Sequence, residues 1–243
     1  MQKISPIIHL LAAFIMLPST SSFLHLSLRS SPTRLFSASP PLPNPSSVLT
    51  STRTWLYNFV LPLKLCPFAY RPLVTSPKAE FRLSYVDPTL PLTSLLRELE
   101  SVSELTSMSP HLTSIVVCPN PDLADFLDYM EFVNGHVNTL PLIKSGELQC
   151  APFHPDFLFS GLDAGSVENN VNRSPYPMFH FLREVDVSRA VDMWQDKGGE
   201  MEDIWTRNAG VMNLLGEEGV DRIRKEGRVC ETVIKKIKDE GFG

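Results

Sequence analysis

The chain has 243 residues, of which 43% are hydrophobic and 20% are charged, which is the composition of an ordinary globular protein. Its formal net charge of −5 excludes a general electrostatic attraction to nucleic acid, so no nucleic-acid partner is expected. The length allows one or two domains, and one is predicted because the N-terminal residues have a composition of their own.

The N-terminal third of the chain contains no Asp or Glu before Glu80. Residues 1–22 combine Lys3, an apolar run and a stretch of small residues, in the order of a secretory signal peptide. The apolar run is too short for a membrane span, and the mature domain is not expected to cross a membrane. Residues 23–52 are rich in Ser, Pro and Thr, which is typical of a disordered organelle transit peptide.

A signal peptide followed by a transit peptide that begins with Phe23 resembles the two-part plastid address of algae with secondary plastids. We therefore expect cleavage after Ser22 and delivery to the plastid through the secretory pathway. A plain signal peptide with a Pro/Ser linker, or an uncleaved anchor, is the alternative, and would give a secreted or endomembrane-lumen protein.

Two helices and two strands are predicted first along the domain. Apolar residues at helical spacing predict a helix over 52–61, which Pro62 ends or kinks. Alternating apolar residues predict a strand at 81–85, and leucines at helical spacing predict a helix over 92–102. The apolar, β-branched run at 112–117 predicts a central strand.

The run Asn-Pro-Asp at 120–122 predicts a helix start, because an N-cap residue is followed by proline and by an acid that faces the helix dipole. That helix buries one apolar face and closes at Gly135. Residues 137–144 are ambiguous, and a third strand is predicted at 147–153.

Ser174-Pro175 repeats the cap-and-proline signal and predicts a helix over 176–185. A further short helix is predicted to end at Trp194, and a helical face continues from Met201 to Gly216. The remaining charged residues carry a weak apolar stripe and predict a helical tail.

Alternation of strands and helices predicts an α/β or α+β domain, with a small, partly parallel sheet of three or four strands, helices packed on it and a helical C-terminal part. Residues 53–216 would form this single globular domain and residues 217–243 the tail. A fourth strand at 157–160 would give a ferredoxin-like two-layer arrangement, which is the main competing fold.

Four cysteines occur, with no Cys-x-x-Cys pair and no histidine at a short spacing. A zinc site is therefore not expected, and no cofactor is predicted. We interpret the cysteines as reduced thiols because Cys118 and Cys150 lie in apolar, strand-like runs. Cys66, which precedes Pro67, is a candidate nucleophile or redox thiol, and the alternative is a small buried apolar residue.

Most of the polar side chains that could carry chemistry lie between residues 149 and 184. His154 and Asp156 follow the third predicted strand, where α/β folds place ligands, so they are candidate catalytic residues. His154 would act as acid or base, oriented by Asp156. The alternative is a histidine whose ring is satisfied by a backbone carbonyl at a turn.

Arg173 is the main candidate for binding an anion, together with Asn172, Ser174 and Arg183. A guanidinium beside the free N–H groups of a predicted helix start suits a phosphate or carboxylate. The alternative is an ion pair from Arg173 to a nearby acid, which would fix the loop.

His180 and Glu184 lie four residues apart on the predicted helix and would share one face of it. They are candidates for a metal-ligand pair or for its second shell. A solvated or capping contact between the two side chains is the alternative.

Three separated motifs, at residues 65–69, 153–161 and 172–184, together resemble an uncharacterised family found chiefly in bacteria. It is the domain-of-unknown-function family numbered fourteen-fifteen, and the resemblance runs from about Trp55 to Leu215. Bacterial members look similar without the leader, so the resemblance implies an imported domain. It implies no activity, and Pro62 departs from the expected family pattern.

Two functions are consistent with these residues. The first is a soluble organellar enzyme for a small anionic metabolite that is held by Arg173 and a helix N-terminus, with His154 and Cys66 as catalytic groups. The second is a non-catalytic binding or assembly module in which the polar cluster is structural. A metal site built from His154, His180 and carboxylates is a third alternative. The sequence does not determine the substrate, the reaction or the oligomeric state.

Overall fold

A computed structural model describes residues 43–66, 80–110, 112–195 and 202–242. Nearly all of the predicted leader lies outside these ranges, and so do Pro67 and the rest of the first family motif after Cys66. Targeting to the plastid therefore stays a prediction. Within the described ranges, no helix combines the length and the hydropathy that a transmembrane span requires.

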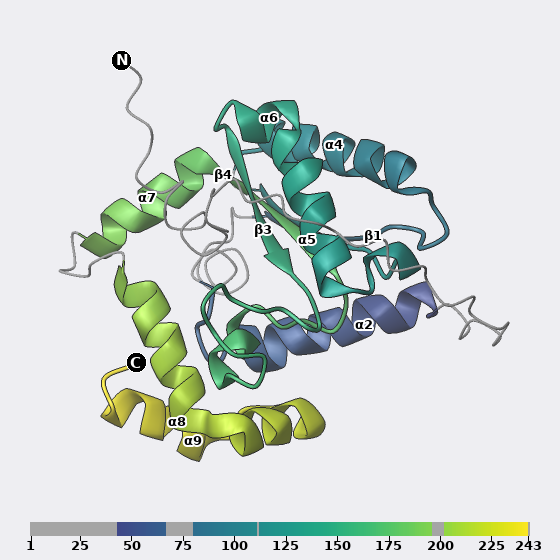
Figure 1. Cartoon of the computed structure of the whole chain (residues 1–243). Helices are drawn as coiled ribbons and strands as arrows, with labels where there is room; N and C mark the ends of the chain where they lie inside the picture. The colour runs from purple at the N-terminus through teal and green to yellow at the C-terminus, as the bar shows by residue number, and fades with distance from the viewer. Residues whose placement is uncertain (1–42, 67–79, 111, 196–201, 243) are drawn as a thin grey trace, which may run out of the picture.

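A four-stranded mixed sheet forms the centre of the fold (Figure 1). Its spatial order is β1 (Glu80–Tyr85), β2 (Leu112–Val117), β4 (Met178–Arg183) and β3 (Leu148–Phe153). β1 and β2 are parallel, and β4 runs antiparallel to both of its neighbours. The predicted α+β class with a partly parallel sheet is confirmed.

Helices on one face of the sheet provide the connections between the parallel strands. α4 (Leu92–Met108) is the crossover from β1 to β2, which parallel strands require. α5 (Phe126–Gly135), the short turn η4 (Val137–Thr139) and α6 (Pro141–Lys144) follow β2. We call the apolar cluster beneath them the α4-side core. It includes Leu95, Leu99, Val116, Tyr129, Phe132, Phe179 and Phe181.

The N-terminal and C-terminal helices lie together on the other face (Figure 1). α2 (Pro45–Trp55) continues as one π-helical segment, η1 (Leu56–Val60). α8 (Glu202–Glu226) and α9 (Glu231–Asp239) end the chain, and α7 (Glu184–Gln195) follows β4. The apolar cluster on this face is the α2-side core. It includes Trp55, Phe59, Ile115, Phe153, Met178, Val211, Val220, Ile223 and Ile237.

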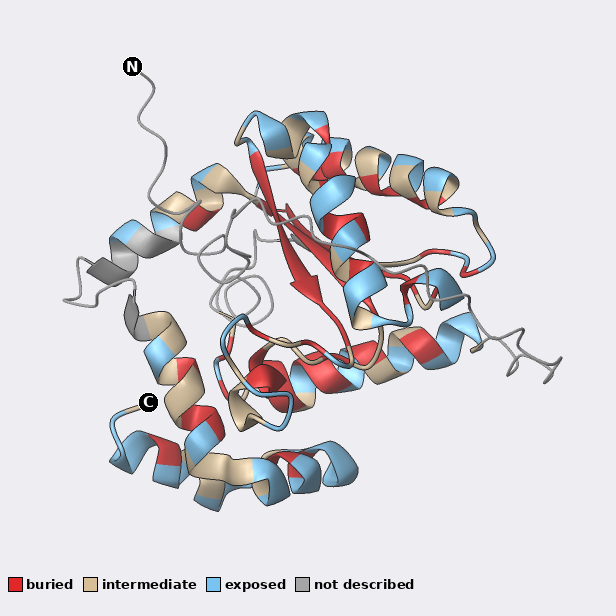
Figure 2. Cartoon of the chain, viewed as in Figure 1, coloured by how far each residue is buried: buried red, intermediate tan, exposed pale blue. Residues whose placement is uncertain are grey.

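Both faces of the sheet are therefore covered, and β2, β3 and β4 are buried along most of their length, as Figure 2 shows in red, whereas the edge strand β1 is only partly buried. Successive side chains of a strand point to opposite faces. In β4, Phe179 and Phe181 enter the α4-side core, whereas Met178 enters the α2-side core. The two-layer arrangement that competed in the sequence prediction is not formed.

The helix predicted at 176–185 was wrong, because this segment is strand β4. The cap-and-proline signal does not start a helix here, since the Ser174 hydroxyl donates to the carbonyl of Tyr176 instead. Pairing with β2 on one side and β3 on the other satisfies the hydrogen-bonding groups of the segment's backbone. The strand at 157–160 that the competing fold required is not formed, and that segment is loop.

Two helix starts differ from their predicted positions. α2 begins at Pro45, where Asn44 accepts a hydrogen bond from the Ser46 N–H at 2.8 Å. The signal at 120–122 produces only a short 3₁₀ turn, η3 (Pro121–Leu123). α5 starts after it, capped by the Asp125 carboxylate.

The C-terminal helices are tied to the turn that follows η1. The Arg207 guanidinium donates to the carbonyl of Phe242 at 2.9 Å and to the carbonyl of Lys64 at 3.2 Å. Asn208 donates to the carbonyl of Leu65 at 2.8 Å. α8 bends at Gly216, whose φ of 63° and ψ of 173° are not helical. Together these contacts and the bend set the course of α8 beside α2.

Candidate functional site

His154 is fully buried, and main-chain atoms occupy both of its ring nitrogens. Nε2 donates to the carbonyl of Leu123 at 3.1 Å, and Nδ1 accepts from the Asp156 N–H at 3.0 Å. Burial lowers the pKa of His154 and favours the neutral ring, which lies 5.1 Å from the Tyr129 ring between centroids. A catalytic role for His154 stays a prediction, and this geometry favours the alternative of a histidine satisfied at a turn.

Arg173 lies beside His154, since the two residues form an isolated parallel β-bridge. Its guanidinium is directed at the loop: Nε donates to the carbonyl of Phe157 at 3.3 Å, and Nη2 donates to the carbonyl of Ala164 at 2.7 Å. The helix N-terminus expected next to Arg173 does not exist, because the chain enters β4 there. The guanidinium therefore stabilises the loop main chain.

Asparagine side chains bind the same loop to the sheet. Asn169 is fully buried, accepts from the Phe159 N–H at 3.0 Å and donates to the carbonyl of Asp163 at 2.9 Å. Asn172 donates to the carbonyl of Pro152 at 3.1 Å. These asparagines use their amides on backbone groups, as Arg173 and His154 use their side chains. We call residues 154–174, with this set of bonds, the bonded loop.

His180 and Glu184 do not share a helix face, because His180 is in β4 and Glu184 is the first residue of α7. His180 is buried and shares a hydrogen bond with Thr113 Oγ1, and burial lowers its pKa to about 4. The Glu184 carboxylate accepts hydrogen bonds from Gln149 Nε2 and from the Ser188 hydroxyl. The predicted helical pair was wrong because the strand was not recognised.

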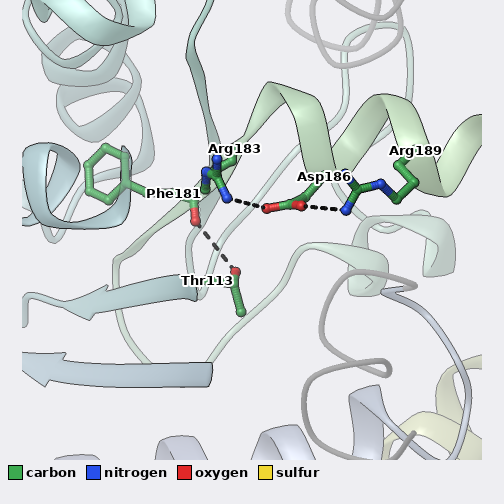
Figure 3. A network of polar contacts seen from close by, with 5 residues as sticks. All are labelled: Thr113, Phe181, Arg183, Asp186 and Arg189. Carbon is green, nitrogen blue, oxygen red and sulfur yellow. Dashed lines mark hydrogen bonds and ion pairs between the residues drawn. The ribbon is translucent and has the colours of Figure 1, made fainter. Parts of the chain in front are cut away.

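Arg183 belongs to a charged network at the start of α7 (Figure 3). Its Nη1 lies 3.4 Å from Asp186 Oδ2, and Arg189 Nη1 lies 3.5 Å from the other oxygen of that carboxylate. Figure 3 also shows Thr113 donating to the carbonyl of Phe181 at 3.4 Å. Arg183, the last residue of β4, thus has an acid partner in the first turn of α7.

The two remaining catalytic candidates, Cys66 and Asp156, lie in different environments. Cys66 is half-buried at the edge of the α2-side core, and Asp156 is exposed. All four cysteines are free thiols. In the described part of the chain, no three side chains of His, Cys, Asp or Glu gather in a metal-binding arrangement.

A pocket of about 440 Å³ opens between α2 with η1, the segment at 174–175 and the C-terminal part of α8. It contains only one residue of the predicted set, Ser174. Its lining consists of Thr50, Ser51, Thr54, Trp55, Asn58, Phe59, Ser174, Pro175, Ile223, Arg224 and Gly227.

α2 and η1 contribute a polar stripe and an apolar wall to this pocket. Thr50, Thr54 and Asn58 are spaced four residues apart and therefore lie on one helical face. No hydrogen bond joins the Thr54 or Asn58 side chain to another residue in the described ranges. Trp55 and Phe59 lie beside the stripe and are packed in the α2-side core. The pocket thus offers polar groups next to preformed apolar surface.

Arg224 is the charged residue of the described lining. Its guanidinium carbon lies 5.5 Å from the centroid of the Phe59 ring, and its Nη2 donates to the carbonyl of Arg173 at 3.4 Å. Arg224 is exposed by its accessible surface, and the partial desolvation of its guanidinium lowers its pKa. The positive charge of Arg173 lowers this pKa further, whereas Asp221 and Glu217 raise it. A cation is therefore held on an aromatic face at the pocket.

A family model described as "Protein of unknown function (DUF1415)" matches residues 47–222. The chain belongs to the DUF1415 family. The DUF1415 match covers the three motifs at 65–69, 153–161 and 172–184, so the resemblance inferred from them is confirmed. It ends two residues before Arg224. No curated protein and no solved structure gives a significant match to the chain.

Sequence reasoning missed Arg224 and Asn58. Arg224 was assigned to a charged tail, and Asn58 was placed in an ordinary amphipathic helix. The available signal was the four-residue spacing of Thr50, Thr54 and Asn58 beside the apolar face of their helix. No local pattern connects that stripe to Arg224.

Proposed function

We propose that this DUF1415 protein binds a small organic anion in the pocket between α2 and α8. The observation that supports the proposal is the placement of Arg224 at the pocket wall, in a described lining that contains no Asp or Glu. Ligand sites are usually mostly apolar cavities with a few polar groups that fix the orientation of the ligand. Trp55, Phe59 and Ile223 would supply the apolar part here, and Arg224 the charge.

Binding is favoured over catalysis by the state of the predicted catalytic groups. The general base proposed from sequence, His154, has both ring nitrogens occupied by main-chain atoms. Arg173, proposed to hold the substrate, donates to two loop carbonyls. Beside Arg224, by contrast, the Thr54 side chain of α2 and the Asn58 side chain of η1 have unused hydrogen-bonding capacity within the described residues. An anion in the pocket would gain both the charge and these donors.

A thermal-shift screen of the purified chain against carboxylated and phosphorylated metabolites tests the proposal. A ligand at a hundred times its dissociation constant stabilises the folded state by about 2.7 kcal/mol. We expect at least one ligand to raise the Tm of the wild type, and Arg224→Gln to remove the shift.

Lys225→Gln is the matched control, because Lys225 is exposed on the same helix and outside the described pocket lining. It removes the same charge and should leave the shift intact. A ligand whose shift survives Arg224→Gln but disappears in Arg173→Gln would instead place the anion at the bonded loop. The absence of a shift with every ligand would contradict the proposal.

A further inference from the structure

We infer that the ligand is a monocarboxylate with an apolar, ring-sized body, and not a phosphate ester. The inference rests on the proposed function and names the chemical class that the pocket would take. Its basis is the amount of charge that the lining can balance, the orientation of the one guanidinium and the rigidity of the apolar wall.

The charge available at the pocket matches a single negative charge. Arg224 is the one cationic residue among the described lining residues. The guanidinium of Arg173, whose carbonyl Arg224 contacts, is engaged by the carbonyls of Phe157 and Ala164. A phosphate ester carries about 1.5 to 2 negative charges and three strong acceptor oxygens. The other polar residues of the described lining, such as Thr54 and Asn58, are neutral, so part of that charge would stay unbalanced.

The helix ends at the pocket also oppose a highly charged ligand. Phosphates are commonly held at helix N-termini, where free N–H groups and the dipole favour anions. Here the lining comes from the middle of the continuous α2–η1 helix and from residues 223–227, at the C-terminal end of α8. C-terminal ends carry partial negative charge. They weaken the attraction for a dianion more than for a carboxylate.

The orientation of Arg224 suits a planar acid. Its guanidinium carbon lies over the Phe59 ring, 5.5 Å from the centroid, and only Nη2 contacts a carbonyl, that of Arg173 at 3.4 Å. The other N–H groups form a donor edge that is available to a ligand. A carboxylate accepts two parallel hydrogen bonds from that edge. The ring of Phe59 is thus the platform that holds the donor edge in place.

The apolar wall is rigid because its members are core residues. Trp55, Phe59 and Ile223 expose 7%, 2% and 4% of their surfaces, and the Trp55 ring packs edge-on against Phe153 at 5.7 Å. A preformed wall favours a ligand body that is itself apolar and compact. The 440 Å³ volume lies near the lower end of the range of about 300–1,000 Å³ that small-molecule sites occupy. It fits a single ring with short substituents.

Calorimetry with five probes tests the inference: phenylacetate, acetate, 2-phenylethanol, phenyl phosphate and inorganic phosphate. We expect phenylacetate to bind at least tenfold more tightly than each of the other four. Acetate lacks the apolar body, 2-phenylethanol lacks the charge, and the two phosphates carry more charge than Arg224 balances. Arg224→Gln should weaken phenylacetate binding at least tenfold.

Thr54→Trp locates the binding, because Thr54 is exposed and lines the pocket, so that an indole there fills the space. Arg53→Trp is the matched control, since Arg53 is exposed on α2 and absent from the lining. We expect Thr54→Trp to weaken phenylacetate binding at least tenfold and Arg53→Trp to leave it within twofold.

The outcomes separate the two proposals. Tighter binding of phenyl phosphate, lost in Arg224→Gln and in Thr54→Trp, would overturn the carboxylate class and keep the pocket. Phenylacetate binding that survives both variants would overturn the pocket as its site. If none of the five probes binds, the ligand class fails, while a metabolite that shifts the Tm in an Arg224-dependent manner would still support the proposed function.

Discussion

The bonded loop at residues 154–174 and the pocket between α2 and α8 are both polar, and they use their polar groups in opposite ways. In the loop, His154 and Arg173 give their hydrogen bonds to main-chain atoms. At the pocket, the side chains of Thr54 and Asn58 form no hydrogen bond within the described residues, and Arg224 makes one long hydrogen bond of 3.4 Å. Polar residues therefore indicate a binding site only where hydrogen-bonding capacity remains unused.

His154→Ala should have the largest effect on stability. The change leaves the Leu123 carbonyl and the Asp156 N–H without partners and opens a cavity beside Tyr129. We expect a loss of about 3–5 kcal/mol in the free energy of unfolding, measured with urea. Asp156→Ala, which removes an exposed carboxylate, should cost less than about 0.5 kcal/mol. A His154→Ala variant with wild-type stability would show that the loop is not held by this ring.

The stability of the wild type should fall between pH 6.5 and about 4 because of His180. Burial lowers the pKa of His180 from 6.5 to about 4, so the unfolded chain binds a proton over this range before the folded protein does. The contribution of His180 to the free energy of unfolding is fully present above pH 6.5 and amounts to about 3 kcal/mol. His154, whose pKa is also lowered by burial, adds a contribution of the same sign.

Urea unfolding at several pH values, with His180→Phe beside the wild type, measures this dependence. The variant lacks the titrating group, and its stability should change less between pH 6.5 and 4. An identical pH dependence in the two proteins would mean that His180 has the same pKa in the folded and unfolded states, and that this part of the sheet is open to water.

Arg173→Gln should produce a moderate loss of stability. The guanidinium gives up its hydrogen bonds to the carbonyls of Phe157 and Ala164, which we expect to cost about 1–2 kcal/mol. Arg53→Gln, at an exposed site, serves as the control for the loss of one arginine. If Arg173→Gln abolishes ligand binding while stability is unchanged, the bonded loop is itself the anion site and the comparison between the two regions fails.

Arg224→Gln should have a smaller effect on stability than Arg173→Gln and the largest effect on binding. The folded protein loses a stacking contact with Phe59 that is worth about 0.5–1 kcal/mol. The thermal shift given by a ligand should disappear. Greater instability than that of Arg173→Gln would show that Arg224 is mainly a structural link between α8 and the bonded loop.

Local patterns were sufficient to predict much of the sheet. The alternation in β1, the β-branched residues of β2 and the apolar run of β3 are properties of single segments, and these strands lie where they were predicted. β4 was missed because Ser174-Pro175 carries a local helix signal. Pairing with strands from two distant segments overrides that signal, since it satisfies the whole backbone of β4.

The residues predicted from the sequence marked a structural unit but did not locate the pocket. Their concentration marks a real structural unit, because the bridge between His154 and Arg173 brings two of the family motifs together. The sequence could not show whether their side chains point to main-chain atoms or to a ligand. Ser174 is the predicted residue that also lines the pocket, together with Asn58 and Arg224, which were not predicted.

By itself, the sequence determined the family, the α+β class and most of the strands, because these depend on composition, on motifs and on periodicity within one segment. Only the tertiary structure decided the place of β4 and the existence of the pocket. The polar stripe of α2 and Arg224 of α8 belong to opposite ends of the described chain. They meet because the two helices pack on the same face of the sheet, which no local pattern specifies.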